Sequence, residues 1–287
     1  LNEFLDKSSY CEVAWHQLGK QDFTLKEYNK ALTSYDFAII SDDTFVGAYL
    51  ERGKVLEQLN RFEDAIENYI ITLKLDEPTS FALLRIGCCY EKLENYDLAL
   101  QYYNQILDNV DLKNQRPNFF VVVLDNYAHT LYLSNIRRQL PGLYLTALKI
   151  CDSINDSYSS IIINQHLAEY YNGESRKDSA LYYAYRAKNI SEQYHNDDLL
   201  KSLLLLSNIE KGEKAAKHLK DYVRLSDSLQ KVERATRNKY ARIKYETNQI
   251  EQENIRIARE RMWLLIISVT LIITSFFDNV EVFLYKI

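Results

Sequence analysis

Glycine and proline are scarce in this sequence. Seven glycines and three prolines, Pro78, Pro117 and Pro141, are spread over 287 residues. Both residue types interrupt regular secondary structure, so their scarcity favours long helices joined by short turns. Because 47% of the residues are hydrophobic and 26% are charged, the chain can bury a core. We therefore predict an all-α fold.

Signatures of catalytic and metal sites are also missing. The sequence has no glycine-rich phosphate loop, no nucleophile elbow and no zinc-protease motif. Neither the cysteines nor the histidines show metal-ligand spacing, and the cysteines do not form a disulfide framework. We predict that the chain is not an enzyme and that it has no catalytic residue, metal or cofactor. The residues considered are Cys11, Cys88, Cys89, Cys151, His16, His129, His166, His195 and His218.

Positive charge is not in excess, because the formal net charge is −5. A general affinity for nucleic acid is therefore not expected. Tyrosine, by contrast, occurs 23 times. In stacked helices its ring can fill the space between neighbours while its hydroxyl reaches solvent.

A period of 34 residues, without gaps, runs through the first part of the chain. We interpret each period as two antiparallel helices that cross closely at small residues, with aromatic side chains filling the space between pairs. A single pair cannot bury its apolar face, so the pairs must stack. The matched sets are Gly19, Gly53 and Gly87; Leu25, Leu59 and Leu93; Tyr28, Phe62 and Tyr96; Ala31, Ala65 and Ala99; and Tyr35, Tyr69 and Tyr103. Four residues before the glycines stand Trp15, Tyr49 and Leu83.

This pattern resembles that of the tetratricopeptide repeat family, which residues 12–110 match in three repeats. The resemblance implies a helical-hairpin solenoid that binds proteins or peptides. Arg52 departs from the family pattern because a leucine is usual at that position. Thr72 and Ile106 depart from it at the second small position.

The rest of the chain is predicted to divide into segments of different character. Residues 1–11 form an N-terminal segment, and 111–226 form divergent hairpins of similar type, with a sub-domain boundary at 111–118. The expected hairpins are 119–153, 161–191 and 199–226. A charged juxtamembrane helix (227–261), an apolar helix (262–277) and a tail (278–287) follow.

The charged helix 227–261 carries one weak apolar stripe. Leu229, Thr236, Ile243, Ile250 and Ile257 recur every seven residues, but the companion positions three residues later are mostly charged. A coiled coil needs both positions to be apolar. We expect a solvated connecting helix, with a transient homodimer contact through 227–261.

Residues 262–277 form an uncharged run of 16 residues. A helix of that length spans about 24 Å, which is short of the ~30 Å hydrocarbon core of a bilayer. Trp263 and Phe276 would suit the two membrane interfaces. We predict a single transmembrane helix; the alternative is a helix that caps the solenoid. Three arginines precede the run, and the positive-inside rule alone would place the solenoid in the cytoplasm.

Residues 119–275 resemble Bacteroidetes-type membrane sensors, in which extracytoplasmic repeats lead through a charged helix into one membrane span. The resemblance implies a single-pass protein of the bacterial inner membrane with a periplasmic solenoid. It also implies a histidine-kinase or DNA-binding output domain, which this sequence lacks. The tail 278–287 departs from the family, which has a basic linker there. We therefore expect a fragment or a joined gene.

The tetratricopeptide resemblance implies that the first helix of each hairpin lines a concave groove. The chaperone-binding subfamily grips a carboxylate there, but of the corresponding positions only Arg85 matches, and Glu51 would repel a carboxylate. The predicted groove residues are His16, Lys20, Phe23, Leu50, Lys54, Glu57, Phe81, Leu84, Arg85 and Glu91.

Two functional hypotheses follow. The leading one is a membrane-anchored interaction scaffold, the sensory part of a bacterial signalling protein. The alternative is a soluble adaptor in which residues 262–277 cap the solenoid.

Overall fold

The computed structural model describes residues 11–75, 80–194 and 196–284. It describes no side chain from residue 271 onward, nor those of 194, 196, 237, 240, 241 and 244. Throughout the described residues the secondary structure is helical and contains no strand. The chain forms two units, residues 1–221 and 222–287, and each is described by itself. The helices are α2 (Glu12–Thr24), α3 (Tyr28–Ser41), α4 (Val46–Gln58), α5 (Phe62–Leu75), α6 (Ser80–Lys92), α7 (Tyr96–Leu107), α8 (Leu112–Gln115), α9 (Pro117–Leu133), α10 (Leu140–Ile154), α11 (Ser157–Gly173), α12 (Lys177–Tyr194), α13 (Asn196–Ile209) and α14 (Glu213–Leu284).

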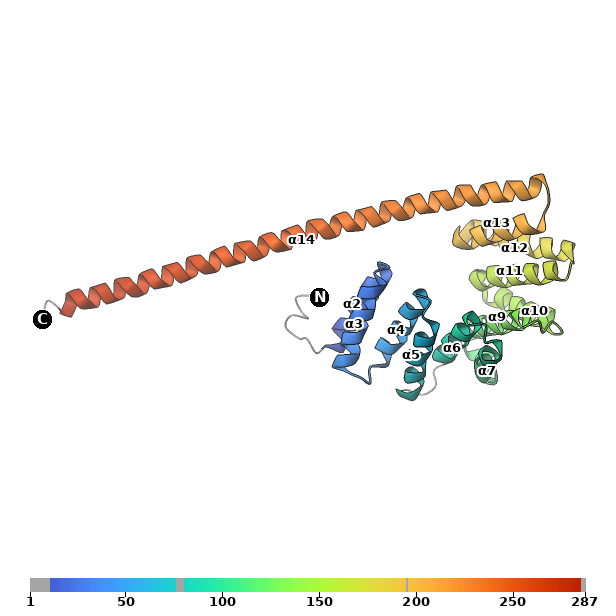
Figure 1. Cartoon of the computed structure of the whole chain (residues 1–287), viewed down its shortest axis with the longest axis horizontal. Helices are drawn as coiled ribbons and strands as arrows, with labels where there is room; N and C mark the ends of the chain where they lie inside the picture. The colour runs from blue at the N-terminus through green and yellow to red at the C-terminus, as the bar shows by residue number, and fades with distance from the viewer. Residues whose placement is uncertain (1–10, 76–79, 195, 285–287) are drawn as a thin grey trace. The chain divides into compact units, whose positions relative to one another are not determined.

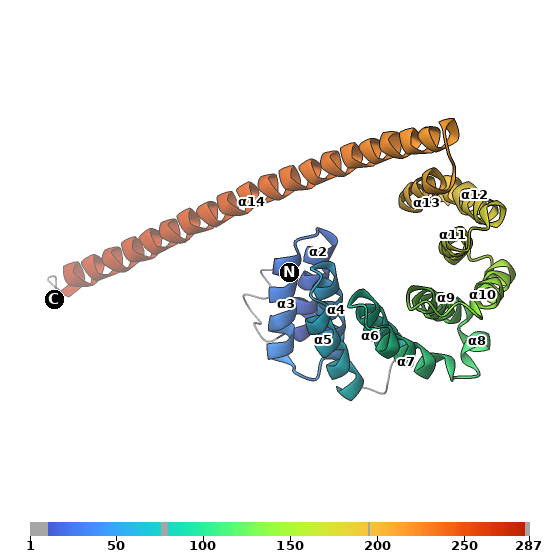
Figure 2. The ribbon, with the colours of Figure 1, turned by 45° about the vertical axis from the view of Figure 1, so that its right-hand side comes forward.

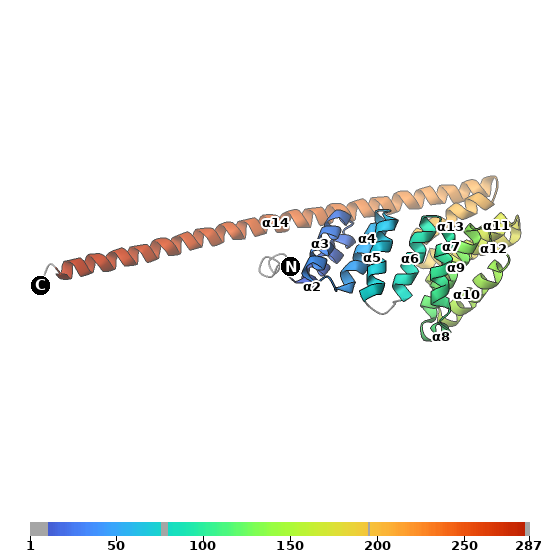
Figure 3. The ribbon, with the colours of Figure 1, turned by 60° about the horizontal axis from the view of Figure 1, so that its bottom comes forward.

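The first unit is a stack of helical hairpins. Hairpins 1 to 5 are the pairs α2–α3, α4–α5, α6–α7, α9–α10 and α11–α12, and α13 packs against α12 and α11. Figures 1 and 3 show successive hairpins of this unit lying side by side. The all-α solenoid predicted from the 34-residue period is therefore confirmed.

The first helices of the hairpins share one side of the stack. In three of the four pairs of neighbouring hairpins the first helices contact one another: α2 contacts α4, α6 contacts α9, and α9 contacts α11, whereas α4 and α6 show no contact of that extent in the described part of the chain. Among the described residues, consecutive second helices show no contact of comparable extent. The first helices are therefore closer together and form the inner face of the curved stack, as Figure 2 shows for α4, α6, α9, α11 and α13.

A tyrosine ring presses on a glycine in each of the first three hairpins. A Cβ built on Gly53 would lie 2.6 Å from Cε1 of Tyr69, which is closer than real Cβ contacts. Gly19 and Tyr35 repeat this arrangement at 2.5 Å, and Gly87 and Tyr103 at 2.4 Å. The tyrosines are fully buried. This confirms that the two helices of a hairpin cross closely at the small residue.

The later hairpins keep the internal spacing of the first three. Sixteen positions separate Gly53 from Tyr69, and the same interval separates Ala128 from Tyr144 and Ala168 from Ala184. All of these alanines, and Tyr144, are fully buried. The extra residues that loosen the period therefore lie outside this interval. Some lengthen the helices, since α9 and α11 have 17 residues each against 13 in α4, and others lie after α7, where α8 occupies part of the longer connection.

The turn inside each hairpin is also constant. Seven positions after each small residue, a residue other than glycine adopts a positive φ, between 57° and 64°. The next residue donates its backbone N–H to a carbonyl near the end of the first helix, as Asn95 does to Tyr90 at 2.8 Å. This arrangement is a Schellman motif. The turn residues are Lys26, Asn60, Glu94, Asn135 and Ser175.

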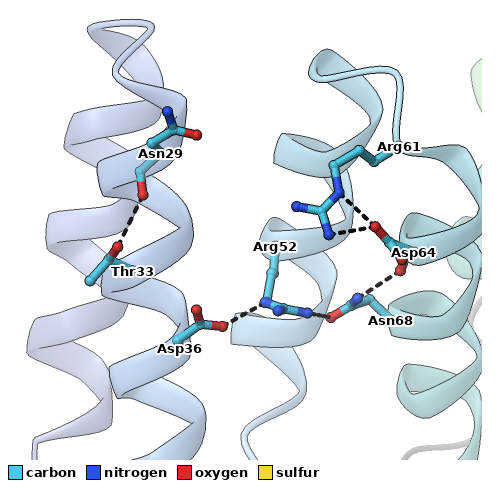
Figure 4. Close-up of polar contacts among 7 residues, drawn as sticks. All are labelled: Asn29, Thr33, Asp36, Arg52, Arg61, Asp64 and Asn68. Atoms are coloured by element: carbon cyan, nitrogen blue, oxygen red, sulfur yellow. Dashed lines mark hydrogen bonds and ion pairs between the residues drawn. The ribbon is translucent and has the colours of Figure 1, made fainter.

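Arg52 illustrates what a departure from the repeat pattern can contribute. It lies on α4 and points between the second helices of hairpins 1 and 2 (Figure 4). Its Nε donates to Asp36 Oδ1 at 2.7 Å on α3, and its Nη1 donates to Asn68 Oδ1 at 3.0 Å on α5. Asn68 in turn donates to the backbone carbonyl of Asp64 at 2.7 Å. A hydrogen-bonded arginine therefore joins three helices where leucine would give apolar contact.

Helix α14 begins in the first unit and runs for 72 residues. Exposed ion pairs such as Arg242–Glu246 at 2.8 Å line it, and the side chains of Ile243, Ile250 and Ile257 on the predicted stripe are exposed. A long charged helix was expected here. The predicted homodimer contact has no support in these contacts.

The predicted membrane localisation is wrong. Among the helices of the described part of the chain, none combines the length and the apolar character that crossing a membrane requires. The physical reason is the length of the apolar run: 262–277 covers about 24 Å of helix, against ~30 Å of hydrocarbon. Its charged neighbours, Arg261 and Asp278, stop it from extending. The transmembrane helix is therefore not supported. The inner-membrane location and the periplasmic side of the solenoid depended on it and are not supported either. The side chains of 271–277 lie outside the described residues.

The glycine–tyrosine contact predicts that Gly53→Ala destabilises the chain. The added methyl group overlaps a fully buried ring, and overpacking of this kind costs about 1–3 kcal/mol, more than the helix propensity that alanine gains. Gly142→Ala on α10 is the matched control, because its Cβ would meet nothing within 4 Å. It should raise stability by up to about 1 kcal/mol. Thermal unfolding measures both changes, and equal effects of the two substitutions would contradict the close crossing.

The turn geometry predicts that Glu94→Gly stabilises the chain. Glu94 has φ +58°, which strains an ordinary residue and suits glycine. We expect a gain of about 0.5–1 kcal/mol in urea unfolding. Glu67→Gly, in the exposed interior of α5, is the control and should lose about 1 kcal/mol. If Glu94→Gly lost as much as the control, the motif would not set the turn.

Candidate functional site: the inner face of the hairpin stack

Four tyrosines carry their hydroxyls to the inner face. Tyr35, Tyr69, Tyr103 and Tyr144, here called the tyrosine ladder, are fully buried, and burial raises the pKa of each hydroxyl well above its usual value. They therefore remain protonated hydrogen-bond donors. Tyr69 donates to Glu57, and Tyr103 donates to Cys88 Sγ at 3.5 Å. The hydroxyls of Tyr35 and Tyr144 have no partner among the described residues.

The carboxylate of Glu57 joins hairpins 2 and 3. Arg85 of α6 donates from Nε to Glu57 Oε1 at 2.8 Å and makes a second contact through Nη2. Burial opposes the charge on Arg85, but Glu57, together with Tyr69 and Cys88, outweighs burial, so the pKa of the arginine is raised. Arg85, the one match to the carboxylate-binding subfamily, is thus already paired within the chain.

The other predicted groove residues of hairpins 1 to 3 also lie on first helices. Lys54 contacts Glu51 at 2.8 Å, and its Nζ lies 5.2 Å from the centroid of the Phe81 ring. Leu84 is buried, whereas Lys20 is exposed. No contact of the described residues tests whether these side chains bind a partner, so the groove list stays a prediction. The remaining members are Phe23 and Leu50, both partly buried, and Glu91, described below.

His16 shows an incompletely satisfied site at the start of the inner face. Its ring lies 5.2 Å from that of Phe45 and 5.8 Å from that of Tyr35. Its Nε2 is buried and has no hydrogen-bond partner within the described part of the chain. Burial, the largest influence, lowers the pKa of His16.

A second group of inner-face residues contains one predicted groove residue, Glu91, and four residues that the sequence analysis missed. Glu91 on α6, Asp125 and His129 on α9, and His166 and Glu169 on α11 form what we call the acid–histidine cluster. His166 Nδ1 lies 2.9 Å from Asp125 Oδ1, and the His129 and His166 rings stack with centroids 4.1 Å apart. Their positions beside Ala128 and Ala168 were the available signal, since those alanines continue the glycine positions.

Burial shapes the titration of this cluster. It lowers the pKa of His129 to about 3, with a smaller contribution from His166. Burial also opposes protonation of His166, but Asp125, with smaller contributions from Glu169 and Glu91, more than compensates, so the pKa of His166 is raised. The pKa values of Glu91 and Glu169 are raised, mainly because burial disfavours their charged forms.

The chemistry open to this face is hydrogen bonding and ion pairing. Within the described residues, no group of three histidine, cysteine or acidic side chains is arranged to hold a metal ion. The partly buried Cys88 and the buried Cys89 have raised pKa values, chiefly through burial, so they are poor nucleophiles. The arrangement resembles a recognition surface more than a reaction centre.

Comparison with known proteins agrees with the hairpin architecture. Residues 81–110 match the profile of the tetratricopeptide repeat family. Solved structures similar to this chain include PilW, a type IV pilus biogenesis factor, with 17% identity over 76% of this chain and 92% of that chain and a TM-score of 0.56. The Pseudomonas aeruginosa pilF protein shares 17% identity over 74% and 88%, with a TM-score of 0.55. The APC/C hetero-tetramer Cut9–Hcn1 shares 15% over 79% and 42%, with a TM-score of 0.62.

These comparisons establish a tetratricopeptide-type solenoid fold. The resemblance to membrane sensors with a kinase or DNA-binding output gains no support from them. They are similarities of fold at low sequence identity, so they do not transfer the partners of those proteins to this chain.

The buried His129 predicts a pH-dependent stability. Its folded pKa of about 3 lies below the unfolded value near 6.5, so the unfolded chain binds the additional proton. The free energy of unfolding is therefore not reduced by this group above pH 6.5, and it decreases as the pH falls towards 3. The loss at pH 5 is about 2 kcal/mol. His129→Gln should therefore lose less stability between pH 7 and pH 5 than the wild type does in urea unfolding.

His166 provides the control of opposite sign. Its raised pKa gives stability that is present below pH 6.5 and is lost as the pH rises through the folded value. His166→Gln should therefore steepen the acid loss. Identical pH profiles for the wild type and both variants would contradict the assignment.

Proposed function

We propose that this tetratricopeptide-type solenoid is an adaptor that binds an extended segment of a partner protein along its inner face and performs no chemistry. The fold supports this proposal, because hairpin stacks present extended concave surfaces for binding. The predicted groove residues on α2, α4 and α6 and the acid–histidine cluster on α6, α9 and α11 would be the contact surface.

The observation that carries the proposal is a set of buried polar atoms without partners along this face. They are His16 Nε2, Tyr35 Oη, His129 Nδ1 and Tyr144 Oη, all without a hydrogen bond inside the described part of the chain. Each unsatisfied buried group costs about 1–3 kcal/mol. An extended peptide offers backbone N–H and C=O groups at regular intervals, so its binding would offset part of this cost.

The hypothesis that residues 262–277 cap the solenoid stays a prediction for that segment. The side chains of Met262, Trp263, Leu264 and Leu265 are each more than half exposed. Contiguous apolar surface of this kind marks a segment that needs a covering partner.

Selection from a random peptide library displayed on phage, with the full chain as immobilised target, tests the adaptor proposal. We expect enriched peptides that bind in solution, and we expect them to slow hydrogen exchange in α6, α9 and α11. Asn126→Trp on the inner face of α9 should reduce their affinity at least tenfold, because the large ring would obstruct the face. Lys149→Trp, exposed on α10, is the matched control and should leave affinity unchanged.

Two results would contradict the proposal. One is the absence of any enriched peptide that binds the free chain in solution. The other is binding that protects only the second helices, α5, α7, α10 and α12, and is insensitive to Asn126→Trp.

A further inference from the structure

The pair Glu57–Arg85 is an internal example of how this face binds a cation. Glu57 stands four positions after Gly53, and Arg85 stands two positions before Gly87 of the next hairpin. Arg85 holds the carboxylate through two nitrogens. The ladder tyrosine of the same hairpin, Tyr69, contacts both groups. The carboxylate, the guanidinium and the tyrosine hydroxyl thus satisfy one another's hydrogen-bonding groups.

The next hairpin along the chain has a carboxylate at the position that corresponds to Glu57, but the hairpin after it has no cation at the position that corresponds to Arg85. Glu91 stands four positions after Gly87, as Glu57 does after Gly53, and it is equally buried against the stack. Two positions before Ala128, where the counterpart of Arg85 belongs, stands Asn126. Its side-chain nitrogen lies 3.8 Å from Cys88 Sγ. In the following hairpin the same position is His166, so of the three only Asn126 is not basic.

Glu91 is only partly satisfied by its own surroundings. Its Oε2 accepts a hydrogen bond from the buried hydroxyl of Thr130. The nearest cation to its Oε1 is Lys92, at 4.0 Å, and the Lys92 side chain is 63% exposed. Such a distant and solvated ammonium group neutralises a buried carboxylate poorly.

Negative charge is in excess around Glu91. Asp125 and Glu169 lie, with Glu91, within electrostatic range of His166, which is the one group of the cluster with a raised basic pKa. Asp125 is bound to His166, whereas Glu169 has no hydrogen bond or ion pair among the described residues. Lys201 of α13 is the other cation that acts on Glu169. Three carboxyl groups therefore face one internal histidine.

An independent observation indicates a ligand at the same place. Tyr144 is fully buried, and its hydroxyl has no partner although it lies in the field of Asp125, Glu169 and Glu91. Its ring centroid is 6.0 Å from that of His166. In hairpin 2 the corresponding hydroxyl, that of Tyr69, contacts both a carboxylate and a guanidinium. A polar group that enters between α6, α9 and α11 would give Tyr144 a partner of this kind.

We propose that an arginine side chain of the bound segment enters the inner face between α6, α9 and α11 and takes, at Glu91, the place that Arg85 takes at Glu57. This assignment rests on the proposed function, since it specifies one residue of the partner. Arginine fits better than lysine because its planar fork can hold a carboxylate through two parallel hydrogen bonds and still donate to Glu169 or Tyr144. The site would thus recognise the partner's arginine both by its positive charge and by the planar geometry of its guanidinium group.

The peptides selected on the full chain test this inference directly. We expect them to share an arginine at one aligned position. Replacing that arginine by citrulline, which keeps the shape and removes the charge, should weaken binding by about tenfold to a hundredfold. Replacement by lysine should cost less than citrulline but more than the neutral substitutions at other peptide positions.

Substitutions in the chain then locate the contact. Glu91→Gln keeps the size of the side chain and should abolish the difference between arginine and citrulline peptides. Glu67→Gln, exposed on α5, is the matched control and should leave that difference intact. Asn126→Arg supplies the missing cation from within, so it should raise the unfolding midpoint and weaken arginine peptides by at least tenfold. Thermal unfolding of each variant confirms that it is folded.

The possible outcomes distinguish a failure of the arginine site from a failure of the adaptor proposal. Peptides that bind the inner face without a shared arginine, or that bind Glu91→Gln with the same preference as the wild type, would overturn the arginine site and leave the adaptor intact. Failure to obtain any inner-face binder would remove the adaptor proposal itself. An unfolding midpoint of Asn126→Arg at or below that of the wild type would also count against the site, because a guanidinium placed there would find no carboxylate to bind.

Discussion

The contact between a tyrosine ring and a small residue sets the geometry of every regular hairpin in this chain. It fixes the distance between the two helices, because the ring lies where a Cβ atom would otherwise stand. It also fixes the direction in which the tyrosine hydroxyl points, namely towards the inner face. Where the small residue becomes Ala128 the tyrosine remains, and where it becomes Ala168 the partner shrinks to Ala184. Packing thus also determines the chemistry of the inner face. The tyrosine ring fills the space between the two helices, and its hydroxyl is a buried hydrogen-bond donor on the surface that the first helices share.

The hairpins could be read from the sequence because their internal distances are fixed by this contact. The interval from Gly53 to Tyr69 repeats even in hairpin 4, which the 34-residue period no longer describes. The acid–histidine cluster could not be read in the same way. Asp125 and His166 are 41 positions apart, an interval set by the length of α10 and its connections rather than by any repeat. The fork between Arg52, Asp36 and Asn68 was equally hidden, since only the stacking of α3, α4 and α5 brings these side chains together. Periodicity predicts which residues pack within a hairpin, but the pairing of charges between hairpins depends on the rotation of one hairpin against the next.

The inner face divides into a part that satisfies its own charges and a part that does not. In hairpins 2 and 3, Lys54 holds Glu51 and Arg85 holds Glu57, so the face is already neutralised. A buried pair of this kind gives little net stability, but removing one partner is costly. Of the two pairs only Glu57–Arg85 joins different hairpins, since Lys54 and Glu51 both lie on α4. In hairpins 3 to 5 the carboxyl groups of Glu91 and Glu169 lack such a partner, and their pKa values are raised mainly because of burial. Binding specificity would therefore reside in the second half of the face, although the repeat pattern is most regular in the first.

The contacts of α12, α13 and the first turns of α14 show how the stack ends. Ser202 of α13 and His218 of α14 stand at the positions of the small residue and the ladder tyrosine, sixteen apart. Instead of a ring resting on glycine, His218 Nε2 lies 3.4 Å from Glu210 Oε2 and 3.3 Å from the Tyr185 hydroxyl, and all three side chains are at least partly buried. The first turns of α14 are thus held by polar contacts that need no close helix crossing. Beyond Asp221 the helix belongs to the second unit, and its stretch up to Arg261 is rich in charged side chains. Hairpin 5 already pairs Ala168 with Ala184, and α13 still packs against it, so loss of the aromatic ring does not by itself end the stack. The stack ends where polar contacts of His218 replace the ring and where α14, beyond Asp221, belongs to the second unit.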